Sequence, residues 1–127
     1  MPIIGVGTDL VRIDRLRQFV TKQKTALLER LFTLGEREYA FAKRDPAPHL
    51  AARFAAKEAC LKAFGTGLRG GISWRDMEVV PDDLGCPGLL LSGQAAALAD
   101  AKGVEMVHLS YSHEGHYAVA TVILESR

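Results

Sequence analysis

Hydrophobic positions in the first half of the chain follow two periodicities. Residues 3–8 form an apolar, β-branched run, which predicts a short buried strand. Between residues 10 and 30 the apolar positions recur at helical spacing, and residues 27–32 carry a second apolar set typical of a separate short helix. Another brief helix should open at Gly35 and Glu36 and end before a proline-containing loop at residues 45–48.

The second half begins with the strongest helical pattern of the chain, an alanine-rich run over residues 50–64. Gly65 stands where a left-handed residue is expected to end that helix. A further helix should span residues 93–102, with Ser92 as its N-cap and Gly103 at its end. Strands are expected at residues 77–80, 89–91, 104–112 and 117–124, with a hairpin turn at residues 113–116. The pattern predicts a mixed α+β fold.

Composition places the chain among ordinary globular domains. A length of 127 residues favours a single domain over residues 1–127, and 48% hydrophobic residues are enough for a modest core. A net charge of +1 argues against a nucleic-acid binder. We see no signal peptide and no apolar run long enough to cross a bilayer, and the two cysteines are too few for a disulfide framework. We therefore expect a cytoplasmic protein without a membrane contact.

The helix at residues 50–64 concentrates positive charge around one acid. Glu58 lies among Arg53, Lys57 and Lys62, and the spacing puts Glu58 and Lys62 on one helical face. Such an arrangement is expected where phosphate groups and a divalent cation are held together. The alternative is a weak surface ion pair between Glu58 and Lys62. Ala55, Ala59 and Ala63 form a stripe of small residues on which another element can pack closely.

Asp9 is the second candidate acid, directly after the first predicted strand. It either caps the following helix or joins Glu58 in holding Mg²⁺, which takes one or two carboxylates and leaves its other positions to water and phosphate oxygens. The glycine-rich loop at residues 65–71 can present backbone N–H groups to a phosphate, although it is not a Walker A loop. Residues 9–30 also carry six basic residues against three acids, a face that either attracts an acidic partner or is merely solvated.

Taken together, these features resemble one family. The segments that carry the resemblance are Gly7-Thr8-Asp9, the helix around Lys57-Glu58-Ala59 with Lys62, its continuation Gly65-Thr66-Gly67, and the late Ser110-Tyr111-Ser112-His113. They are similar to the holo-acyl-carrier-protein synthases, the small single-domain class of 4′-phosphopantetheinyl transferases. The resemblance covers essentially the whole chain. It implies a small, mainly antiparallel sheet packed on a long central helix, in a homotrimer with active sites between subunits.

The same resemblance implies a reaction and its site. The 4′-phosphopantetheine arm of coenzyme A moves to a serine of apo-acyl carrier protein, leaving adenosine 3′,5′-bisphosphate. Asp9 and Glu58 would hold Mg²⁺, and Lys62 would contact the pyrophosphate. Arg53, Lys57 and His113 are candidates for the remaining phosphates. The other expected ligand-lining residues are Gly65, Thr66, Gly67 and Ser112.

Three questions stay open at the level of sequence. The serine proton would pass either to Glu58 or to a metal-bound water held by Asp9. The acidic carrier protein would dock on Arg15, with Arg12 or Arg17 beside it. Two other functions compete with the transferase: a non-catalytic module that binds coenzyme A or nucleotide phosphates, and an RNA-binding or purely structural oligomer.

Overall fold

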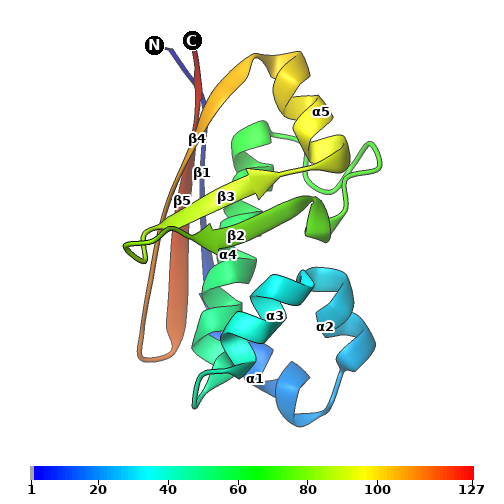
Figure 1. Cartoon of the computed structure of the whole chain (residues 1–127), viewed down its shortest axis with the longest axis vertical. Helices are drawn as coiled ribbons and strands as arrows, with labels where there is room; N and C mark the ends of the chain where they lie inside the picture. The colour runs from blue at the N-terminus through cyan, green and yellow to red at the C-terminus, as the bar shows by residue number, and fades with distance from the viewer. Residues whose placement is uncertain (1) are drawn as a thin grey trace.

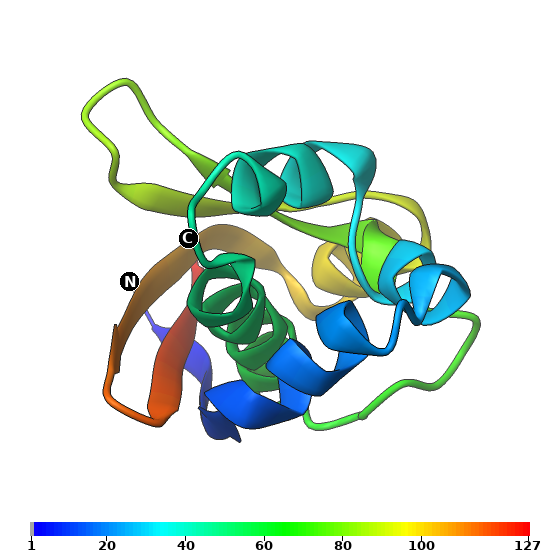
Figure 2. The ribbon, with the colours of Figure 1, turned by 90° about the horizontal axis from the view of Figure 1, so that it is seen from below.

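A single long helix, α4 (Pro46–Phe64), forms the centre of the computed structural model, which describes residues 2–127. A three-stranded sheet lies on one side of α4, and a two-stranded hairpin with three short helices lies on the other (Figures 1 and 2). The remaining elements in chain order are β1 (Ile3–Arg12), α1 (Ile13–Thr21), α2 (Thr25–Leu31), α3 (Leu34–Phe41), the 3₁₀ helix η1 (Trp74–Asp76), β2 (Met77–Pro81), β3 (Pro87–Leu91), α5 (Gly93–Lys102), β4 (Val104–Glu114) and β5 (Tyr117–Ser126). The predicted α+β class is confirmed.

The larger sheet joins the two ends of the chain. Its strand order is β1-β5-β4, and both pairings are antiparallel. Asp9 lies opposite Ala120, and Ala120 lies opposite Tyr111, so these three residues share the face toward α4. Both termini consequently lie at the same end of the molecule (Figure 1).

Helix α4 is buried along most of its length, with 14 of its 19 residues inaccessible. Such all-round burial is typical of a core helix. Asp45 caps its start by accepting a hydrogen bond from the Ala47 N–H, and Gly65 ends it with φ of 78°. The loop predicted at residues 45–48 is wrong, because Pro46 occupies the first helical turn, where a missing N–H costs nothing.

Strand β1 packs unusually close to α4, at the predicted stripe of small residues. A Cβ atom on Gly7 would lie 1.9 Å from the Ala59 carbonyl oxygen, and one on Gly5 would lie 2.1 Å from that of Ala63. No side chain larger than hydrogen fits there. These two glycines therefore fix the distance between the strand and the helix.

The first strand is longer than predicted and changes the position of Asp9. It continues to Arg12, so α1 begins at Ile13 rather than near Leu10. Asp9 is thus a mid-strand residue, and its alternative role as a helix cap is wrong. The other predicted strands are each extended by one to two residues at one or both ends. No helix in residues 2–127 is long and apolar enough to span a membrane.

Candidate active site

The two predicted acids meet where β1 crosses α4. Asp9 points from β1 toward the helix, and the Lys62 ammonium lies 2.9 Å from its Oδ1 and 3.1 Å from the Thr8 carbonyl oxygen. Lys62 therefore pairs with an acid on the neighbouring strand rather than with Glu58, one turn away on its own helix. The alternative of an isolated Glu58–Lys62 surface pair is not what the structure contains.

Glu58 is a carboxylate without a local partner. No hydrogen bond or ion pair within residues 2–127 reaches its side chain. Its pKa is raised, first by burial and then by the negative charge of Asp9, while Lys62 and Arg15 act in the opposite direction. The negative charge of Asp9 thus disfavours the ionised form of Glu58, and a cation between the two carboxylates would relieve this repulsion.

The donor set at this point fits Mg²⁺ rather than a metal held by the protein alone. Within residues 2–127 no group of three or more histidine, cysteine, aspartate or glutamate side chains is close enough to bind a metal. Asp9 and Glu58 supply hard oxygen ligands, and Mg²⁺ commonly takes one or two of these and completes its shell with water and phosphate.

A cavity of about 450 Å³ opens beside these acids. It is lined by Glu58, Leu61, Lys62, Gly65, Gly67, Leu68 and Trp74. The predicted loop residues Gly65 and Gly67 thus share a wall with Glu58 and Lys62. Trp74 was missed at the level of sequence. It comes from η1, lies 5.2 Å from the Phe54 ring between centroids, and had no motif around it that signalled a site.

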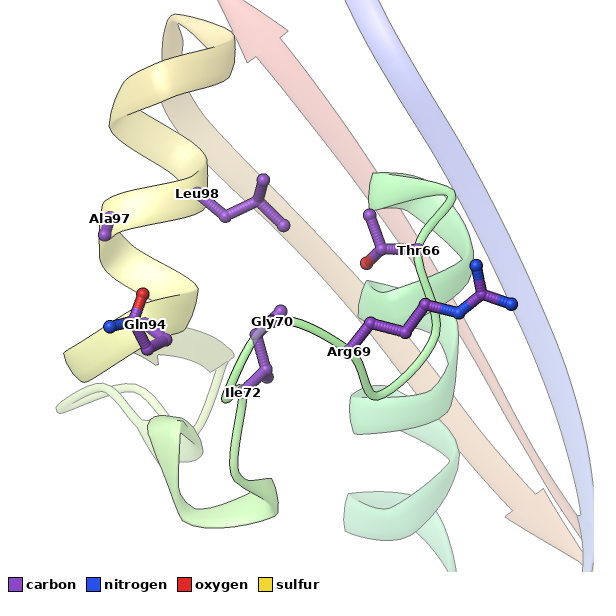
Figure 3. A pocket seen from close by; sticks show the side chains of 7 residues that line it. All are labelled: Thr66, Arg69, Gly70, Ile72, Gln94, Ala97 and Leu98. Carbon is purple, nitrogen blue, oxygen red and sulfur yellow. The ribbon is translucent and has the colours of Figure 1, made fainter.

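A second cavity of about 310 Å³ lies on the other side of the glycine loop (Figure 3). Thr66 and Leu98 face one another across it, and the Arg69 side chain points away from α5. Thr66 therefore presents its side chain to a different cavity from the one lined by Gly65 and Gly67. The loop itself has left-handed backbone at Gly65, Gly67, Gly70 and Gly71, a conformation that favours glycine at all four positions.

Lys57 corrects the sequence-based assignment. Its side chain is fully buried, and its ammonium donates hydrogen bonds to Glu36 Oε1 at 2.6 Å, the Leu31 carbonyl at 2.8 Å and the Trp74 carbonyl at 3.2 Å. An ammonium with three protein acceptors has no donor left for a phosphate. The prediction that Lys57 contacts coenzyme A is therefore wrong, because this residue ties four elements together in the core.

Arg53 and His113 lie together at the other end of α4. The His113 ring is 5.6 Å from the His49 ring, and the Arg53 guanidinium stacks 4.1 Å from the centre of the Tyr39 ring. Arg53 donates one hydrogen bond from Nη1 to the His49 carbonyl, while its buried Nε and Nη2 have no partner among residues 2–127. Sequence reasoning found Arg53 and His113 but not His49 or Tyr39, since neither belongs to a motif.

Ser112 lies apart from His113 despite being its neighbour in sequence. Strand alternation puts His113 on the face toward α4 and Ser112 on the outer face, opposite Val119.

Of the three predicted docking arginines, Arg17 already binds two acids, Asp14 at 2.7 Å and Asp45 at 2.6 Å. Arg15 lies over the Phe54 ring, 5.5 Å from its centre, and close enough to Glu58 to affect that pKa.

The sequence and fold match known proteins over almost their entire length. The model of the family described as the 4′-phosphopantetheinyl transferase superfamily matches residues 5–122. The chain belongs to this superfamily. A holo-[acyl-carrier-protein] synthase of Syntrophotalea carbinolica is 58% identical over 126 residues, which cover 98% of each chain.

Solved structures give the same family. The holo-[acyl-carrier-protein] synthase of Neisseria meningitidis superposes with a TM-score of 0.89 at 35% identity, covering 98% of this chain and 100% of that one. The synthase of Bacillus anthracis, solved in complex with CoA (3′,5′-ADP), superposes with a TM-score of 0.81 at 38% identity, covering 98% of each chain. The chain is thus a full-length match to the small synthase class of this transferase superfamily, as its motifs predicted.

Proposed function

We propose that this chain is a Mg²⁺-dependent holo-acyl-carrier-protein synthase. The serine hydroxyl of an apo-carrier protein attacks the phosphorus that bears the pantetheine arm, and the P–O bond to the second phosphate breaks. The serine proton passes to a base, and adenosine 3′,5′-bisphosphate leaves. The observation that carries this proposal is the convergence of Asp9, Glu58 and Lys62 beside the glycine loop in a chain of this family.

Each of these three side chains has a distinct role. Asp9 and Glu58 would hold Mg²⁺, which supplies Lewis-acid stabilisation of charge on the phosphate oxygens. Lys62 lines the same cavity as Glu58, and its ammonium would stabilise the negative charge that grows on the leaving phosphate. Glu58 also has the properties of a proton acceptor, since its raised pKa brings it closer to neutral pH.

The nucleotide end of coenzyme A would extend from this cavity toward Arg53 and His113. The Arg53 guanidinium is buried without a carboxylate partner in residues 2–127, so an anion nearby would balance its charge. We assign the 3′-phosphate to this end of α4. Gly65 and Gly67 would line the cavity beside Glu58 and Lys62, at the pyrophosphate end of coenzyme A.

The outer face of the larger sheet supports assembly of several copies. Its exposed side chains include Val6, Leu10 and Met106, which are 60%, 62% and 53% accessible. An apolar surface of this kind is typical of a protein interface. We propose that second copies of this chain cover it in a homotrimer, which native mass spectrometry would detect directly. A monomer at micromolar concentration would contradict this assembly.

One assay separates the transferase from its alternatives. The protein is incubated with coenzyme A, Mg²⁺ and a purified apo-acyl carrier protein, and the carrier is followed by intact mass. A transferase adds the mass of one phosphopantetheine group, and chelation of the metal stops the addition. Binding of coenzyme A without any change in carrier mass would favour the non-catalytic module, and salt-dependent RNA binding without a metal requirement would favour the third alternative.

A further inference from the structure

His49 lies at the centre of the charged cluster at the N-terminal half of α4. Its ring contacts those of Tyr39 and His113, with centroid distances of 5.8 and 5.6 Å. The elements packed around it contribute the following titratable or charged groups: Tyr39 and Lys43 from α3 and the turn after it, Asp45 from the helix cap, Arg53 from the next turn of α4, and His113 from β4. His49 is partly buried among them.

The charge around His49 is unbalanced in favour of cations. Arg53 has no ion pair within residues 2–127, and its buried Nε and Nη2 donate no hydrogen bond to any of these residues. Asp45 is the one acid facing His49 in this set, and it already accepts a hydrogen bond from Arg17 at 2.6 Å. The pKa of His49 is lowered by burial first, and then by His113, Arg53 and Lys43. Burial and the surrounding cations therefore both disfavour the charged form of His49.

A bound phosphate would offset the excess of positive charge around His49. A dianion near Arg53 and His113 supplies the missing negative charge and favours the charged form of His49. Because linkage is reciprocal, protonation of His49 strengthens phosphate binding by the same factor by which phosphate favours protonation. The protonated His49 ring then adds a charge-assisted hydrogen-bond donor to the site.

We propose that His49 takes up a proton when the 3′-phosphate of coenzyme A binds, and so determines the preference for coenzyme A over 3′-dephospho-coenzyme A. This inference rests on the proposed function, which puts the 3′-phosphate at this end of α4. The sign of the pH dependence follows. Affinity for coenzyme A rises as the pH falls through the titration of His49, whereas affinity for the dephospho form does not.

Calorimetry in buffers of different ionisation enthalpy measures this proton directly. The oligomeric protein is titrated with coenzyme A and with 3′-dephospho-coenzyme A at about pH 7.5, where a phosphate monoester with a second pKa of about 6 is already largely dianionic. We expect wild-type protein to take up a fraction of a proton with coenzyme A and none with the dephospho form. His49→Gln should remove this uptake and weaken coenzyme A binding roughly three- to tenfold.

His116→Gln is the matched control, since His116 lies in the exposed hairpin turn after β4. It should keep the wild-type uptake and affinity. Unchanged uptake in a folded His49→Gln protein, or equal uptake with both ligands, would overturn the role of His49. Loss of uptake in His113→Gln alone would also overturn it, by assigning the proton to His113. If wild-type protein binds neither ligand, the proposed function itself fails.

Discussion

At Glu58, the ionised carboxylate that the proposed chemistry needs lowers the stability of the metal-free fold. Its folded pKa is raised by burial and by Asp9, so in the pH range between its unfolded and folded pKa values the native state binds more protons than the unfolded state. Stability without metal therefore falls as the pH rises through that range. A carboxylate kept here against this cost is typical of a functional position.

Replacing Glu58 by Gln should raise stability and lower activity. Without metal, Glu58→Gln is expected to raise the Tm at neutral pH and to leave it unchanged at pH values below the unfolded-state pKa of Glu58, where the carboxyl is protonated in both states. The same variant should lower carrier modification at least about 100-fold, because it loses a metal ligand and a proton acceptor. Thermal melts across pH and the intact-mass assay measure both effects. Glu29→Gln, an exposed change on α2, serves as control. Wild-type turnover in Glu58→Gln would remove it from the site.

At the scale of elements, the contact between β1 and α4 determines where the acids lie. Gly7 is two residues before Asp9 on the same strand face, and it meets the Ala59 carbonyl one residue after Glu58. The spacing between the two carboxylates thus depends on a glycine against a helix backbone rather than on a side-chain contact.

Gly7→Ala should move β1 away from α4. The added Cβ would lie 1.9 Å from a backbone oxygen, so we expect a loss of about 1–3 kcal/mol of stability and a fall in kcat larger than any change in KM. Chemical denaturation and steady-state kinetics measure these quantities. Gly88→Ala is the control, because its Cβ would make an ordinary 3.5 Å contact and should change stability by less than about 1 kcal/mol. Equal losses in both variants would contradict the close-approach explanation.

The pair of Lys57 and Glu36 holds several elements in register. Glu36 accepts hydrogen bonds from the Thr33 and Val79 N–H groups, while Lys57 reaches the last residue of α2 and the first residue of η1. Both side chains are fully buried, so neither charge has water as an alternative partner. Because Trp74 lines the cavity with Glu58 and Lys62, this pair also supports one wall of the site.

Removing one partner of this pair should cost more than removing both. Lys57→Met is expected to lose about 3–5 kcal/mol of stability by leaving the Glu36 carboxylate buried without a cation. The double variant Lys57→Met with Glu36→Gln should recover part of that loss, and a double-mutant cycle by urea denaturation gives the coupling. Glu105→Gln breaks only an exposed contact of 3.8 Å with Arg127 and should change stability by less than about 0.5 kcal/mol. A Lys57→Met protein as stable as wild type would contradict this network.

The contrast between Lys62 and Lys57 shows where sequence reasoning reached its limit. Both lysines lie in one charged helix, and periodicity alone cannot tell which face of that helix meets the core. The motif correctly placed Asp9 beside Glu58 and Lys62, because the small side chains of α4 let β1 pack directly against the helix at that point. Lys57 was misassigned because its partner, Glu36, lies in a capping box 21 residues away. Trp74 and His49 depend on tertiary packing and carried no local signal.

At the scale of the whole molecule, some basic side chains form ion pairs within the chain, and others remain available to a partner. Arg17 holds α1 to the cap of α4 through Asp45, while Arg12 and Arg15 have no ion pair within residues 2–127. Arg15 lies over Phe54 and belongs to α1, which Figure 1 shows at the end of the molecule opposite to α5. We therefore propose that the positive charge of Arg15, close to Glu58, is where an acidic carrier protein docks.

Arg15→Glu tests this docking face while leaving Arg53 and His113, the residues proposed for the 3′-phosphate, unchanged. Reversing the charge should raise the KM for the carrier protein at least about tenfold, because like charges replace complementary ones, and leave the KM for coenzyme A within about twofold. Lys102→Glu, the same reversal at the far end of α5, should change neither value. The effect of Arg15→Glu should shrink as salt is raised, since an exposed charge is screened within about 10 Å at 0.1 M ionic strength. Equal increases in both KM values would show that Arg15 acts on the site as a whole, through its proximity to Glu58, and not on the carrier.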